Sequence, residues 1–226
     1  MENPWHRLPH EPEYVLPEDK DVLANAHHRE VLHLDLILEP FMGALDAPVV
    51  ILGNNPGIKV DRKPLRQKPT LFEKLRKNLG HELSKEYPFL YLDPDPEIPH
   101  SGWWQRKLKS LFVELGPDEG FARSKLAKSI QAIELFPYVS HRFNHGKLVL
   151  PSQQYSFWLV QKAIEREAFV ILTRGVRRWH ERVKEFNGYY RLITLKEVQR
   201  APISPGNFDN PELFSPIVRA INDFAV

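Results

Sequence analysis

The sequence contains no cysteine. This absence excludes disulfide bonds, cysteine nucleophiles, iron–sulfur clusters and zinc sites built from thiolates. It is compatible with a reducing compartment, and we expect a cytoplasmic protein.

Long apolar runs and strong charge of one sign are also lacking. No stretch approaches the roughly 18 apolar residues of a membrane span, so none is expected. The first five residues do not show the charged-then-apolar pattern of a signal peptide. The net charge is only +2, so binding to an acidic partner such as nucleic acid would depend on local clusters of basic residues.

Proline, in contrast, is abundant. The chain has 20 prolines in 226 residues, against a usual share of about 5 %. We therefore expect long, stiffened connections, above all over residues 87–102, because loops of this length in compact domains tend to be functional.

Residues 47–57 hold the most informative pattern, Ala-Pro-Val-Val-Ile-Leu-Gly-Asn-Asn-Pro-Gly. The apolar run predicts a buried strand over 48–53, and the residues after it are almost all turn formers. Open α/β sheets bind ligands just beyond the carboxyl ends of their strands. The alternative is an ordinary strand-to-loop turn.

Apolar periodicity predicts strands that alternate with helices along the rest of the chain. We expect strands over 48–53, 130–136, 168–173 and 190–195, and helices over 18–29, 71–83, 103–115, 118–128, 153–166, 176–186 and 211–224. Thr70, Ser152 and Asn210 are the candidate caps for three of these helices. The alternation over 32–39 suggests an extended edge segment, with a continued helix as the alternative.

This order of elements, with no internal repeat, predicts one domain over residues 1–226 with an irregular N-terminal arm over about 1–17. The expected fold is a three-layer α/β/α sandwich around a mostly parallel, four-stranded sheet.

At this point the sequence resembles the uracil-DNA glycosylase superfamily. The first motif of that family is a strand followed by Gly-x-Asp-Pro-Tyr or, in the mismatch-specific branch, Gly-Ile-Asn-Pro-Gly; residues 53–57 here read Gly-Asn-Asn-Pro-Gly. The second motif, His-Pro-Ser-Pro-Leu-Ser or Asn-Pro-Ser-Gly-Leu, is most similar to Pro-Ile-Ser-Pro-Gly-Asn at 202–207. Between the two, Pro88-Phe89 and Pro99-His-Ser-Gly102 resemble the family's base-stacking phenylalanine and its Pro-Ser loop. The resemblance covers residues 47–222.

The resemblance implies hydrolysis of the N-glycosidic bond of a flipped, damaged or mismatched base in DNA. Two departures stand out. Pro202 occupies the place of the His or Asn that polarises the base carbonyl, and Glu134 lies near the place of the asparagine that reads the base edge. A glutamate accepts from base amino or imino groups, so a different base is read, or none. The alternative function is a non-catalytic protein on the same fold that binds nucleic acid or a nucleotide.

Specific roles follow from the resemblance and from the residue chemistry. Asn55 is the candidate catalytic residue, because its amide oxygen can hold a water molecule. The candidate substrate contacts are Gly53, Asn54, Gly57, Ile58, Phe89, Glu134, Ser204 and Asn207, with main-chain N–H groups near 57–58 as donors. The candidate DNA contacts are Ser101, Arg174, Arg177, Arg178, Pro205 and Phe208.

Each role has a structural alternative. Asn55 could simply close a turn, Phe89 could be a core aromatic, and the basic run could be a solvated helix face. His141 and His145 have metal-like spacing only if their loop is helical, so we expect neither a metal nor a cofactor. The functional hypothesis predicts one base-sized, partly apolar cleft lined by Asn55, Phe89, Glu134 and Ser204, with basic side chains from 174–182 along its rim.

Overall fold

A computed structural model describes residues 1–26, 31–58, 63–82, 84–98, 102–144 and 146–224. Its strands are β1 (Phe41–Gly43), β2 (Val49–Gly53), β3 (Ile130–Glu134), β4 (Phe169–Leu172) and β5 (Leu192–Thr194). Its α-helices are α1 (Lys20–Ala24), α2 (Lys63–Arg66), α3 (Pro69–Leu79), α4 (Gly102–Glu114), α5 (Glu119–Ser129), α6 (Gln153–Glu165), α7 (Val176–Arg182) and α8 (Phe214–Asp223).

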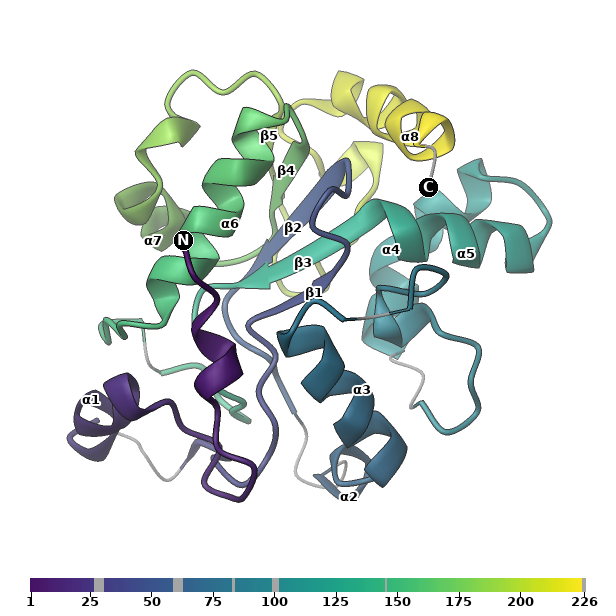
Figure 1. Cartoon of the computed structure of the whole chain (residues 1–226). Coiled ribbons are helices and arrows are strands. Elements are labelled where there is room, and N and C mark those ends of the chain that lie inside the picture. Colours follow the sequence, from purple (N-terminus) through teal and green to yellow (C-terminus); the bar gives the residue numbers. More distant parts are fainter. Residues whose placement is uncertain (27–30, 59–62, 83, 99–101, 145, 225–226) are drawn as a thin grey trace.

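The strands form one mixed sheet in the order β1-β3-β2-β4-β5. The four predicted strands are present as β2 to β5 and run parallel to their neighbours. The prediction of a four-stranded sheet was wrong by one strand, because β1 adds an antiparallel edge beside β3. Helices α6 and α7 lie on one side of the sheet and α4, α5 and α8 on the other (Figure 1).

The central strands are apolar because both of their faces are covered. In β2, the side chains of Val49, Val50, Ile51 and Leu52 are all at most 2 % exposed. Helix α6 packs against β3 and β4, whereas α8 packs against β2. Continuous apolar runs are what buried parallel strands require, and this is why the sequence predicted these strands correctly.

The N-terminal arm also belongs to the core. Trp5 and Tyr14 are buried, and both join the hydrophobic cluster that contains the sheet. The amide nitrogen of Asn3 donates to the carbonyl oxygen of Leu79 at 2.7 Å, which fixes the arm to the end of α3.

Several local predictions were wrong. Residues 32–39 form neither a strand nor a helix: Leu32 makes a single bridge to Ser140, and the alternating leucines are buried, three of them in the hydrophobic cluster that contains the sheet. The helix predicted over 18–29 is shorter, ending at Ala24, with 27–30 outside the described residues. Helix α2 was not predicted.

Two of the three predicted helix caps were also wrong. Thr70 lies inside α3 and its hydroxyl donates to Glu97, while Ser152 makes no side-chain capping bond. Asn210 does cap the last helical segment, accepting from the N–H of Glu212 ahead of α8.

Candidate functional site

The carboxyl ends of the parallel strands surround a cleft of about 400 Å³. β3 lies on one side of β2 in the sheet, and the next strand along the chain, β4, lies on the other side. Such a reversal of strand order is a topological switch point, and open α/β sheets bind their ligands there, beyond the carboxyl ends of the strands. The lining comes from β1 and β3, from the segments that follow β2, β3 and β4, and from α4 and the loops before β1 and α4: Glu39, Phe41, Met42, Asn55, Pro56, Gly57, Ile58, Tyr91, Trp103, Trp104, Arg106, Ala132, Glu134, His141 and Arg174.

Asn55 is held in one orientation at this cleft. Its Nδ2 atom donates to Oγ of Ser140 at 2.8 Å and to the carbonyl oxygen of Pro56 at 3.2 Å. The hydroxyl of Ser140 in turn donates to the carbonyl of Arg142. The Ser140 hydroxyl and the Pro56 carbonyl must therefore both accept a hydrogen bond from Asn55. This requirement places Nδ2 of Asn55 toward these two oxygens and Oδ1 away from them. Oδ1 remains an acceptor that no described residue uses.

Glu134 is the last residue of β3 and pairs directly with Gly53 at the end of β2. The two are packed so closely that a Cβ atom on Gly53 would lie 2.2 Å from Oε2 of Glu134. Burial raises the pKa of Glu134 to about 8, and the positive charges of Lys107 and Arg174 counteract part of that rise. A carboxyl group with a strongly raised pKa in a cleft is a mark of a functional site.

Lys107 is fully buried next to the cleft. Its Nζ atom donates to the carbonyl oxygen of Ala201 at 3.0 Å and lies 4.2 Å from the centre of the Trp103 ring. Burial, together with the nearby charge of Arg174, lowers the pKa of Lys107 to about 7. The sequence analysis did not identify this residue, although it follows Trp104 by three positions and precedes Leu111 by four. It therefore lies on the buried face of α4.

The aromatic wall of the cleft comes from other residues than the one predicted. Phe89 is 0 % exposed and meets the ring of Trp104 edge-on at 4.8 Å, so the prediction that it stacks on a base was wrong. Tyr91, Trp103 and Trp104 line the cleft instead. The hydroxyl of Tyr91 donates to the carboxylate of Glu39, a buried acidic residue that the sequence analysis also missed.

The loop over 201–208 does not line the cleft. Ser204 precedes a short 3-10 helix and is absent from the lining, so the predicted meeting of Asn55 and Ser204 in one cleft was wrong. Asn207 uses its side chain to bind the main chain of Glu197 and Pro202.

Phe208 and Pro205, at the end of this loop, were both predicted to contact DNA. Phe208 is 0 % exposed, which removes its predicted DNA contact. Pro205 is exposed, and its predicted DNA contact stays a prediction.

The first-motif residues divide into two groups. Gly57 and Ile58 line the cleft, whereas Gly53 and Asn54 do not, and Gly53 acts through its contact with Glu134. The N–H of Ile58 donates to the carbonyl oxygen of Ser140 at 3.3 Å. It is therefore not available as the predicted donor to a ligand.

The basic residues after β4 differ in their surroundings. Arg174 lines the cleft and donates to the carbonyl oxygens of Val198 and Gln199. The side chain of Arg177 is 91 % exposed and pairs with Glu181, while Arg178 packs over the Phe143 ring. Ser101, the remaining predicted DNA contact, lies outside the described residues.

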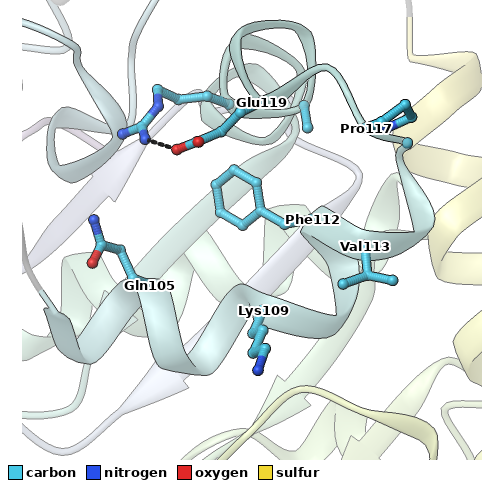
Figure 2. Close-up of a pocket in the computed structure, with 9 residues that line it drawn as sticks. Gln105, Lys109, Phe112, Val113, Pro117 and Glu119 are labelled. Carbon is cyan, nitrogen blue, oxygen red and sulfur yellow. Dashed lines mark hydrogen bonds and ion pairs between the residues drawn. The ribbon is translucent and has the colours of Figure 1, made fainter.

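A second, larger hollow of about 730 Å³ lies between α4 and α5. Figure 2 shows the Phe112 ring between the two helices, with Lys109 and Val113 on α4 and an ion pair that involves Glu119 at the start of α5. None of the sequence-predicted site residues lines it. Asn55, Glu134 and Arg174, in contrast, line the smaller cleft.

Within the described part of the chain, no group of three or more His, Asp or Glu side chains is placed to hold a metal ion. The helices described here are too short or too polar to cross a membrane. Neither a family model, a curated protein nor a solved structure matches this chain.

Proposed function

We propose that the cleft accepts a nucleobase flipped out of DNA and that the protein hydrolyses the N-glycosidic bond of that base. The observation that carries this proposal is the meeting of Asn55 and Glu134, from two different strand ends, in one cleft with aromatic walls. A volume of about 400 Å³ suits one flat ring together with part of its sugar.

The groups present correspond to the steps of the reaction. Trp103 and Trp104 offer ring surfaces for an unstacked base. The oriented Oδ1 atom of Asn55 accepts a hydrogen bond from a water molecule. This hydrogen bond directs a lone pair of the water oxygen toward the sugar carbon. Water adds to that carbon as the carbon–nitrogen bond breaks, the bonding electron pair leaves with the base, and the proton that the water loses ends on the departing base. The positive charges of Arg106 and Arg174 favour the departing anion.

The test is a panel of duplexes that contain uracil, hypoxanthine or a mismatch, with abasic sites revealed by alkaline strand cleavage. We expect wild-type protein to release at least one of these bases. Asn55→Ala is expected to reduce turnover by about 10² or more, because it removes the acceptor for the water, with DNA affinity little changed, because Asn55 is not a proposed phosphate contact.

Asn222→Ala is the matched control, since this asparagine is exposed on α8 and does not line the cleft. An Asn55→Ala variant that cleaves as fast as the control would remove Asn55 from the mechanism.

A second function, binding without catalysis, is favoured by a specific observation. Pro202 stands where the family that the sequence resembles places a polarising side chain, and neither Ser204 nor Asn207 lines the cleft. In that case the wild-type protein shifts labelled DNA in a gel and leaves every base of the panel intact.

A further inference from the structure

Two histidines from distant parts of the chain meet at the rim of the cleft. The Nδ1 atom of His141 lies 3.3 Å from Nε2 of His33, and the two rings are tilted by 53° with their centres 5.5 Å apart. His141 is exposed and lines the cleft, whereas His33 is half-buried. From the sequence, His141 was considered only together with His145, which lies outside the described residues, and its contact with His33 was missed.

The main chain holds this pair in place. Leu32 forms a β-bridge with Ser140. The N–H of His33 donates to the carbonyl oxygen of Val139 at 2.9 Å. The hydroxyl of Ser140 accepts from Nδ2 of Asn55 at 2.8 Å. The two segments that carry the imidazoles are therefore fixed side by side, next to the candidate catalytic residue.

The separation of the two ring nitrogens matches a tetrahedral metal site. Zinc binds histidine nitrogen at about 2.0–2.1 Å, and two such bonds at the tetrahedral angle place their nitrogens about 3.3–3.4 Å apart. A hydrogen bond between the rings is the alternative, but 3.3 Å is long for one. Because His141 is exposed, its ring can rotate so that both lone pairs meet at one ion.

The surroundings of the pair are close to neutral. Besides His141, the charged side chains that act on His33 are Lys63 and Asp35, and these two pair with each other at 2.6 Å. Among the described residues, no third His, Asp or Glu is placed to share an ion with the two histidines. An ion held by two neutral imidazoles keeps its full positive charge, and its other positions are open to water or to an anionic oxygen.

We propose that His33 and His141 bind a zinc ion at the rim of the cleft and that the open positions of this ion accept an oxygen of an anionic ligand. Imidazole nitrogen suits zinc, whereas magnesium prefers oxygen ligands. The proposal goes beyond the nucleobase site and does not depend on it, because metal binding is measured without DNA.

The test is titration calorimetry of the full chain, first stripped of metal with a chelator, against zinc chloride and separately against magnesium chloride. We expect one zinc ion per chain and no magnesium at this site. His33→Gln and His141→Asn put an amide group where the ring nitrogen lies, so a hydrogen bond between the two side chains is retained and the metal ligand is lost. Each variant should weaken zinc binding about tenfold or more. His10→Gln, at an exposed position in the N-terminal arm, is the control and should bind zinc as the wild type does.

Two measurements on the wild-type protein complete the test. The imidazole NMR signals of His33 and His141 must both shift when zinc is added. Cobalt(II) in place of zinc reports on the open positions, because its visible absorption depends on its ligands, and we expect azide to change this spectrum.

The outcomes are distinct. If zinc does not bind, if either histidine signal stays in place, or if either folded variant binds zinc as tightly as the control, the two histidines form only a hydrogen-bonded contact and the proposal is wrong. The proposed nucleobase function is then unaffected. If azide leaves the cobalt spectrum unchanged, the ion has no position open to an anionic ligand. Thermal melting checks that each variant is folded.

Discussion

Glu134 and Lys107 carry opposite charges in water, yet burial moves their pKa values toward each other, to about 8 and about 7. Each is tied to a different element, Glu134 to the end of β3 and Lys107 to α4. Lys107 also contacts the cleft wall, because its Nζ atom lies 4.2 Å from the centre of the Trp103 ring.

The raised pKa of Glu134 has a measurable consequence for stability. Between the ordinary value of 4.5 and about 8, the folded protein holds a proton that the unfolded chain has released, so the free energy of unfolding decreases as the pH rises. Lys107 acts in the opposite direction, but only between about 7 and 10.5, because its pKa is lowered. The effect of Glu134 is therefore isolated between pH 5 and 7.

We expect wild-type protein to lose stability relative to Glu134→Gln by about 1 kcal/mol for each pH unit between pH 5 and 7. Urea unfolding of both proteins at several pH values measures the difference, and contributions from titrating groups that do not interact with Glu134 cancel. Parallel pH profiles for the two proteins would show that Glu134 titrates normally and is not desolvated.

The sequence predicted some residue roles and missed others for physical reasons. Asn55 and Glu134 were predictable because one follows an apolar strand and the other ends one, and parallel strand ends meet at one edge. Phe89 was not, since an aromatic residue in a loop gives no sign of which way its ring points. Lys107 was overlooked because a charged residue is expected at the surface, and only its helical spacing from Trp104 indicates burial.

At the scale of elements, β2 to β5 were predictable and β1 was not. Three residues, Phe41–Gly43, are too few for a periodic signal, and the strand is defined by its pairing with β3. The preceding leucine alternation predicted an extended edge segment, but those leucines are buried without forming a strand. β1 contributes Phe41 and Met42 to the cleft, so the missed strand is part of the site.

Gly43 makes the pairing of β1 with β3 possible. Its φ angle is +103°, and a Cβ atom there would lie 2.2 Å from the carbonyl oxygen of Ile130. Gly116 has a similar φ angle of +107° but nothing within 4 Å of such an atom. An alanine at either position would have an unfavourable φ angle, but only an alanine at position 43 would also clash with β3. Comparing the two substitutions therefore distinguishes backbone strain from the steric clash.

We expect Gly43→Ala to lower the free energy of unfolding by about 2 kcal/mol more than Gly116→Ala, as measured in urea. The free-energy cost of a positive φ angle is common to both variants. The additional loss in Gly43→Ala therefore measures the steric clash with β3. Equal losses would mean that β1 moves aside freely and contributes little to the sheet.

At the scale of the whole molecule, 31 basic and 29 acidic residues nearly cancel, so any attraction to DNA must come from their arrangement. Arg174 lines the cleft, and α7 begins at Val176 after its N-cap Gly175, whose φ angle is +67°. Helix α7 therefore starts beside the cleft with a row of basic residues. Arg177 is the best probe of this surface because it is exposed, whereas Arg178 is engaged with Phe143.

Arg177→Glu is expected to weaken DNA binding regardless of sequence and to reduce the log–log salt slope of the affinity by roughly one unit, because one phosphate contact is lost. Arg219→Glu is the control. It makes the same change in net charge at an exposed position on α8, on the other side of the sheet, and should leave the slope unchanged. Affinities from fluorescence anisotropy between about 50 and 200 mM salt give both slopes. If the two variants change the slope equally, α7 makes no phosphate contact and the DNA lies elsewhere on the molecule.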